Sequence, residues 1–175
     1  MSETQTAPAI RRVTPADAAA TADYMRALRA EVAAGQLDTV PWRQPKTEEE
    51  QRKLLSLMEA APNSTILAAF LGGAVIGLVD IRGGSNEFDR HSGVLGISVA
   101  RDWRGKGLGR ALMQAAIAEA KAWPGFCRIE LEVVTWNTPA IALYESLGFR
   151  IEGRKRKAAC FRGRPEDEFL MALVW

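Results

Sequence analysis

Cysteine and histidine are scarce in this sequence, which excludes several kinds of metal and disulfide architecture. The 175 residues include two cysteines, Cys127 and Cys160, and one histidine, His91. The cysteine spacing fits neither a CxxC pair nor a zinc motif, and a single histidine excludes a histidine-rich metal site. Two free thiols are typical of a protein in a reducing compartment. We therefore expect a protein that binds no metal.

Long apolar segments are also absent. The longest apolar stretch, residues 66–79, is interrupted by Gly72 and Gly73 and is too short to span a bilayer. The first nine residues are polar and lack the apolar core of a signal peptide. These features predict a cytoplasmic protein that does not enter a membrane. We expect residues 1–8 to form a flexible N-terminal tail and residues 9–175 to form a single domain.

Neither sign of charge is in large excess. The chain has 23 lysine and arginine residues against 21 aspartate and glutamate residues, and 47% of its residues are hydrophobic. This composition is typical of a soluble globular domain and does not by itself indicate a nucleic-acid-binding protein. Basic residues gather between Arg150 and Arg164. We expect them to coat a solvated hairpin, and a nucleic-acid or ribosome contact is the less favoured alternative.

Hydrophobic periodicity and turn residues predict a mixed α/β domain. The order is one strand, two helices, three strands, a helix, a strand, a helix and two strands, which fits a single sheet. A capping box at residues 47–50 begins the second helix. Strands are expected at 10–13, 66–70, 75–81, 94–99, 128–134, 149–151 and 169–174. Helices are expected from residue 14 to about 32, 47 to 61, 108 to 122 and 139 to 147.

A glycine-rich turn at residues 104–109 joins the strand at 94–99 to the following helix. Its sequence is Arg-Gly-Lys-Gly-Leu-Gly. Glycines allow a tight turn whose N–H groups point one way, and the helix N-terminus adds the positive end of its dipole. These features predict a diphosphate site. The patterns GxxxxGK[ST] and GxGxxG are not met, and an ordinary strand-to-helix turn is the alternative.

A second group of polar and small residues follows the strand at 128–134. Asn137, Ala140 and Tyr144 are spaced i, i+3 and i+7, so they share one helix face. That face could hold a thiol-bearing ligand. The alternative is that Tyr144 packs in the core with its hydroxyl satisfied and that Asn137 is a turn residue.

Together the two segments resemble the GNAT acyltransferase superfamily. Arg104, Gly107 and Gly109 match its acetyl-CoA signature of Gln or Arg, two residues, Gly, one residue, and Gly or Ala. Residues 137–149 match its pattern of Asn, an Ala-rich turn, Leu-Tyr and a closing Leu-Gly-Phe. The resemblance covers roughly residues 10–175 and is strongest over 94–149. It implies a single, mostly antiparallel sheet flanked by helices on both faces.

The resemblance also implies the cosubstrate and the residues that hold it. The strand at 94–99 would pair its backbone with the pantetheine amides of acetyl-CoA, and a bulge usual there would leave an N–H for the thioester carbonyl. Tyr144 would be the catalytic residue that protonates the departing thiolate, because a phenol titrates near ~10 and a thiol near ~8.5. The expected acetyl-CoA-binding residues are Ile97, Ser98, Val99, Arg104, Gly105, Lys106, Gly107, Leu108, Gly109, Arg110, Asn137, Ala140 and Tyr144.

The predicted function is therefore N-acetyltransferase. An acetyl group would pass from acetyl-CoA to a primary amine of a small molecule, protein or peptide by direct attack in a ternary complex. The expected partners are acetyl-CoA and an amine acceptor, and a second copy of the chain is a further candidate. A non-catalytic acyl-CoA-binding regulatory module is one alternative. A nucleic-acid-binding protein that uses the basic hairpin is the other.

Two features of the reaction stay open at this level. The strand at 94–99 offers Ser98 where several family members carry a glutamate base, so other bases must be considered. The candidates are Glu87, His91, Glu130, Glu132 and a water chain. The acceptor and the length of the acyl group are not identified. Trp42 and Trp136 are expected to lie in loops beside the acceptor cleft, with anchoring on the core as the alternative.

Overall fold

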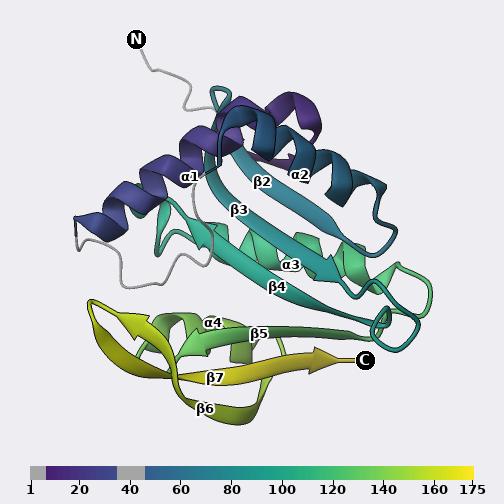
Figure 1. Ribbon diagram of the computed structural model, residues 1–175, viewed down its shortest axis with the longest axis vertical. Coiled ribbons are helices and arrows are strands. Elements are labelled where there is room, and N and C mark those ends of the chain that lie inside the picture. The colour runs from purple at the N-terminus through teal and green to yellow at the C-terminus, as the bar shows by residue number, and fades with distance from the viewer. Residues whose placement is uncertain (1–6, 35–45) are drawn as a thin grey trace.

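The computed structural model describes residues 7–34 and 46–175 and contains one seven-stranded sheet with helices on both faces (Figure 1). The strands are β1 (Ala9–Arg12), β2 (Thr65–Leu71), β3 (Ala74–Gly83), β4 (Ser92–Val99), β5 (Arg128–Val134), β6 (Arg150–Phe161) and β7 (Arg164–Val174). The α-helices are α1 (Ala18–Ala33), α2 (Glu48–Ala60), α3 (Leu108–Lys121) and α4 (Thr138–Ser146). This confirms the predicted element order. Most of the expected tail, residues 1–6, lies outside the described residues.

The spatial order of the strands is β1-β2-β3-β4-β5-β7-β6, and every neighbouring pair is antiparallel except β4 and β5. Two-residue turns of left-handed glycine suit tight hairpins, and Gly72 and Gly73, with φ of 55° and 85°, join β2 to β3. The strand pairings confirm the prediction of a mixed, mostly antiparallel sheet. None of the described helices is long and apolar enough to cross a membrane.

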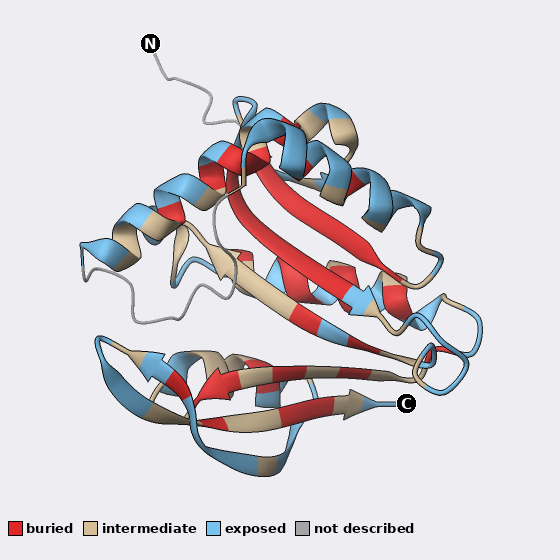
Figure 2. Cartoon of the chain, in the orientation of Figure 1, coloured by how far each residue is buried: buried red, intermediate tan, exposed pale blue. Residues whose placement is uncertain are grey.

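The helices cover the sheet in two layers, with α1 and α2 on one face and α3 and α4 on the other. Strand β2 shows how the sequence serves both layers. Ile66, Ala68 and Phe70 pack in the cluster under α1 and α2, whereas Leu67 and Ala69 pack in the cluster that includes α3. Successive side chains of a strand point to opposite faces. A continuous apolar run therefore marks a strand that is covered on both sides, and β2 and β3 are buried almost throughout (Figure 2).

Strands β6 and β7 are much longer than the sequence predicted. The expected segments were 149–151 and 169–174, whereas the observed strands pair from Arg150 opposite Ala172 to Phe161 opposite Arg164. Most of β6 is exposed at the edge of the sheet, so it lacks the apolar alternation that marks a strand. Its basic residues form the solvated hairpin that was expected.

Strands β4 and β5 pair over a short distance and then separate. Their pairing runs from Ser92 opposite Arg128 to Val94 opposite Glu130, and the two strands then diverge (Figure 1). Within the described residues, no strand pairs with residues 95–99 on the side that faces β5. The prediction of a bulge in β4 is wrong, because β4 stays paired with β3 from Gly93 to Val99 without a register shift. The divergence alone exposes the backbone of β4.

Asp17 connects β1 to the first turn before α1. Its carboxylate accepts hydrogen bonds from both terminal nitrogens of Arg11 at 2.8 and 2.6 Å and from the backbone N of Thr14 at 2.9 Å. The hydrogen bonds from Arg11, with those from Thr14, hold the pKa of Asp17 well below its usual range. The charged form of Asp17 therefore stabilises the folded protein.

Replacing Asp17 with alanine should lower the free energy of unfolding by about 1–2 kcal/mol near neutral pH, through loss of a capping residue and an ion pair. Because its pKa is depressed in the folded state, this stabilisation is complete above the unfolded pKa near ~4 and disappears as pH falls toward the folded pKa. Urea denaturation at neutral and acidic pH measures the difference. The control is Asp23→Ala, which removes an exposed residue paired with Arg26. If Asp17→Ala lowered the free energy of unfolding as much in acid as at neutral pH, the charged form of Asp17 would not be what stabilises the protein.

Candidate functional site

The separation of β4 and β5 opens a pocket of about 430 Å³. Its walls come from β3, β4, β5, β7, α1, the N-cap of α4 and the last turn of α4. Ile97 and Ser98 contribute from β4, and Val134 and Tyr144 contribute from the opposite side. An extended ligand between the strands would find the unpaired edge of β4 as a template for backbone hydrogen bonds.

The glycine-rich turn lies at the N-terminus of α3. Gly107 is the N-cap, with φ of 83°, and Gly105 has φ of 71°. A Cβ at either position would meet no atom within 4 Å, so glycine is needed for the left-handed backbone and the surface above it is open. The first N–H groups of a helix have no partner within the helix. This open turn therefore fits a diphosphate.

The side chains of the turn do not all face this opening. Leu108 is buried in the core, and the Nζ of Lys106 lies 5.6 Å from the centroid of the Trp103 ring. Arg110 donates a hydrogen bond to Ser146 Oγ at 2.9 Å. Gly109 lies beside Leu143 of α4. The backbone, rather than these side chains, presents the most direct contacts for an anion.

Arg104 fastens the turn to the end of β4 and to α1. Its Nε donates to the carbonyl of Val99 at 2.9 Å, and its Nη2 donates to Glu31 at 2.6 Å. In a second contact between the same elements, the hydroxyl of Tyr24 donates to Ser98 Oγ at 3.0 Å. Burial raises the pKa of Tyr24 to about 12. Sequence reasoning did not find Tyr24 or Glu31, because nothing in the local pattern shows that α1 crosses β4.

The face of α4 expected to contact the cosubstrate has a capping role as well. Asn137 accepts a hydrogen bond from the backbone N of Ala140 at 3.3 Å, which caps α4, and it also lines the pocket. Ala140 is partly buried against the core. Asn137 is thus both a turn residue and a wall of the site.

Tyr144 is 8% exposed, lines the pocket and packs against Phe149 with ring centroids 6.0 Å apart. Its hydroxyl makes no hydrogen bond with any residue that the structure describes. Burial raises the pKa of Tyr144 to about 12, so the phenol stays protonated at neutral pH. A protonated hydroxyl that lines a ligand pocket without a protein acceptor fits a proton donor.

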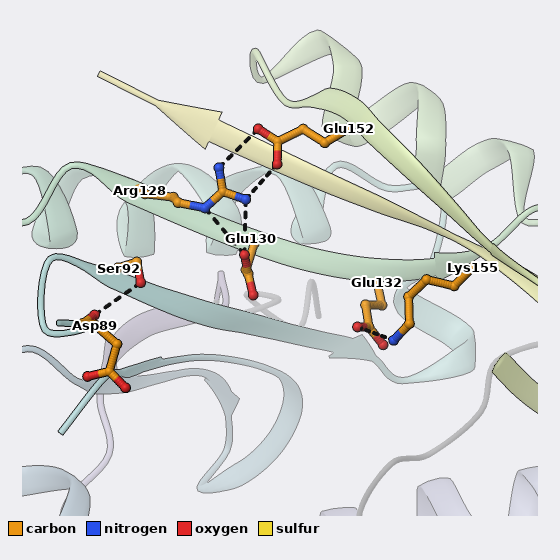
Figure 3. Close-up of polar contacts among 7 residues, drawn as sticks. All are labelled: Asp89, Ser92, Arg128, Glu130, Glu132, Glu152 and Lys155. Carbon is orange, nitrogen blue, oxygen red and sulfur yellow. Dashed lines mark hydrogen bonds and ion pairs between the residues drawn. The ribbon is translucent and has the colours of Figure 1, made fainter. Parts of the chain in front are cut away.

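The four side chains considered as general bases lie in different surroundings. Glu130 accepts a hydrogen bond from Arg128, which also donates to Glu152 (Figure 3). Glu132 accepts a hydrogen bond from Lys155 at 2.6 Å. Figure 3 also shows the hydroxyl of Ser92 donating a hydrogen bond to the carbonyl of Asp89. Asp89 lies in the loop that carries Glu87 and His91, and the side chains of Glu87 and His91 are exposed. Of the four candidates, Glu132 is the one that lines the pocket formed by the described residues.

Two carboxylates in the pocket were missed by sequence reasoning. Asp80 of β3 is 4% exposed and Glu168 of β7 is 1% exposed, and both line the pocket. A charged residue inside an apolar strand is the signal that could have revealed Asp80.

Within the described residues, no group of three or more His, Cys, Asp or Glu side chains is arranged to hold a metal ion. Trp136 packs against Phe161, with ring centroids 5.4 Å apart, and Trp42 lies outside the described residues.

Comparisons with known proteins agree with this geometry. Residues 32–149 match the Acetyltransferase (GNAT) family. The chain is 35% identical over 113 residues to the L-amino acid N-acetyltransferase AaaT of Escherichia coli K12, covering 65% of this chain and 70% of that protein. It is 42% identical over 77 residues to the [ribosomal protein bS18]-alanine N-acetyltransferase of the same organism, covering 44% of this chain and 51% of that protein.

A solved structure extends the likeness over nearly the whole chain. The GNAT-family acetyltransferase of Streptococcus pneumoniae superposes with a TM-score of 0.87 at 30% identity, covering 96% of this chain and 99% of that one. The family match includes β4, the glycine-rich turn and α4, which are the elements around the pocket. The chain therefore belongs to the Acetyltransferase (GNAT) family and is an acetyl-CoA-dependent N-acetyltransferase.

Proposed function

We propose that the acceptor is the α-amino group of a free amino acid. The observation that carries this proposal is the charge distribution of the pocket, where the guanidinium of Arg82 and the buried carboxylates of Asp80 and Glu168 line one cavity. A zwitterion carries a carboxylate that suits an arginine and an ammonium that suits a carboxylate. The similarity to the L-amino acid N-acetyltransferase of E. coli supports the same acceptor class.

The same residues support direct transfer in a ternary complex. The glycine-rich turn would bind the diphosphate of acetyl-CoA, and the unpaired edge of β4 would bind its pantetheine arm. The acceptor nitrogen would attack the thioester from the pocket, and Tyr144 would protonate the thiolate. Neither cysteine lines the pocket formed by the described residues. A covalent enzyme intermediate is therefore not part of the proposal.

An acceptor panel tests the proposal directly. Release of free thiol from acetyl-CoA would be measured with the L-amino acids, with a peptide that begins with alanine, and with spermidine. The α-amine proposal requires that one or more free amino acids have the highest kcat/KM. The peptide is included because of the similarity to the ribosomal-protein alanine acetyltransferase, and a preference for the peptide or for spermidine would refute the free amino acid as acceptor.

Arg82 provides a prediction within this proposal. Arg82→Gln should raise the KM of the amino acid about fivefold, which corresponds to about 1 kcal/mol. The effect is modest because the side chain is 46% exposed and its Nε lies 3.2 Å from Asp80. The Kd of acetyl-CoA, measured by calorimetry, should not change. Arg90→Gln, in the exposed loop after β3, is the control. An unchanged KM in Arg82→Gln would show that this arginine does not bind the acceptor carboxylate.

A cytoplasmic location and self-association are further predictions from the sequence. The first is supported by Cys127 and Cys160, which are both free thiols and so suit a reducing compartment. Light scattering after size-exclusion chromatography tests the second.

A further inference from the structure

Glu168 is a buried carboxylate with an oxygen, Oε2, that has no hydrogen-bond partner among the described residues. The residue lies on β7, opposite Val134 of β5 and Lys155 of β6, and it is 1% exposed. Its Oε2 is the one fully buried side-chain nitrogen or oxygen without a hydrogen bond in the described part of the chain. Burying such an atom costs free energy unless a partner is supplied. The side chain lines the pocket, so a ligand there can supply the partner.

The other acidic side chains near the pocket already have cationic partners. Asp80 lies 3.2 Å from the Nε of Arg82, and Glu132 accepts a hydrogen bond from Lys155 at 2.6 Å (Figure 3). Glu168 is therefore the carboxylate that has an oxygen left for a new donor. An ammonium group is the donor that satisfies both the charge and the hydrogen-bonding capacity of this oxygen.

The surroundings of Glu168 also suit proton transfer. Burial, followed by repulsion from Glu132, raises the pKa of Glu168, and Lys155 opposes this shift. A carboxylate with a raised pKa is a stronger base than an ordinary one, and it returns toward its usual range when a cation binds beside it. The other charged or titratable side chains that line the pocket are Asp80, Arg82, Glu132 and Tyr144.

We propose that Glu168 binds the ammonium group of the acceptor and removes its proton. This inference rests on the proposed function in one respect, namely that the acceptor enters this pocket. Oε2 of Glu168 takes a proton from R–NH₃⁺, which leaves R–NH₂ and a protonated carboxyl. The amine lone pair then forms the C–N bond to the thioester carbon.

The C–S bond breaks, and the thiolate takes a proton from Tyr144. Tyr144 regains a proton from the nitrogen, which carries one more than the amide needs. Glu168 then releases its proton to solvent. The net products are the acetamide, free coenzyme A and one proton.

The test compares Glu168→Gln with Glu166→Gln, a control two residues earlier on the same strand and outside the pocket. With the best L-amino acid as acceptor, kcat/KM should fall about 10²-fold in Glu168→Gln and should stay near the wild-type value in the control. The Kd of acetyl-CoA should be unchanged in both. Hydroxylamine, which is neutral at the assay pH, needs no initial deprotonation, so its acetylation should fall much less.

Stability gives a second readout that does not depend on the acceptor. A carboxylate whose pKa is raised by folding destabilises the protein at pH values above its unfolded pKa. Glu168→Gln should therefore raise Tm at neutral pH, by about 2–4 °C, and this gain should vanish in acid. A rise in Tm together with a loss of activity is the pattern expected of a residue kept for function rather than for folding.

Several results would overturn the proposal. An unchanged kcat/KM in Glu168→Gln would do so, as would equal losses with the amino acid and with hydroxylamine. If the glutamine variant does not fold, Glu168→Asp keeps the carboxylate and should retain most of the selectivity for charged amines over hydroxylamine; loss of that selectivity would also refute the role. If the acceptor panel favours spermidine or the peptide, the free amino acid proposal fails, and the same comparison with that amine still tests Glu168.

Discussion

Tyr144→Phe is expected to lower kcat about 10²-fold, because general acid catalysis contributes 10²–10⁴-fold. The hydroxyl would act mainly in the transition state, so the Kd of acetyl-CoA should remain nearly unchanged. Burial raises the pKa of Tyr144 to about 12, and the same dry surroundings raise the proton affinity of the departing thiolate. The phenylalanine ring keeps the packing against Phe149. Steady-state kinetics and calorimetry separate the two quantities.

The sequence contains one other tyrosine, and it provides the matched comparison. Tyr24→Phe removes a buried hydroxyl that donates to Ser98, so it should lower the free energy of unfolding by about 1 kcal/mol. It should not reproduce the large loss of kcat. A near-normal kcat in Tyr144→Phe would show that solvent or another group protonates the thiolate. A loss of stability as large as that of Tyr24→Phe would favour a structural role for Tyr144.

The elements that could be predicted from the sequence are those with local signals. The capping box at Thr47 and Glu50 is present at the start of α2, and the strand at Arg128–Val134 has the predicted limits. Caps, glycine turns and apolar alternation depend on residues close together in the chain. The exposed strand β6 has no such pattern because its pairing with β7, rather than burial, holds it in place. Its length could not be predicted.

The candidate site divides in the same way. The glycine-rich turn and Tyr144 each lie in a short motif, so they could be predicted as site residues from the sequence alone. Glu168 becomes part of the pocket because β7 lies beside β5 in the sheet, and Tyr24 of α1 is placed by its hydrogen bond to Ser98 of β4. These contacts join residues far apart in the chain. Sequence patterns of one chain do not specify such contacts, so the contribution of β7 to the pocket could not be predicted.

Gly107→Glu is expected to weaken acetyl-CoA binding tenfold or more, which corresponds to a loss of about 1.4 kcal/mol or greater. Gly107 is the N-cap of α3, and the space above it is open. A glutamate there would place bulk and negative charge where the diphosphate is proposed to bind. Calorimetric titration of the folded variant with acetyl-CoA measures the change in Kd.

The backbone at Gly107 complicates this test and also suggests its control. With φ of 83°, any other residue is strained there, at a cost of about 1–2 kcal/mol in stability. Gly125 has φ of 71° and equally open space, but it lies in the turn beyond the C-terminal end of α3. Gly125→Glu should therefore lose similar stability while it keeps its affinity for acetyl-CoA. Equal affinities in the two folded variants would remove the diphosphate from this turn, whereas a loss confined to Gly107→Glu would place it there.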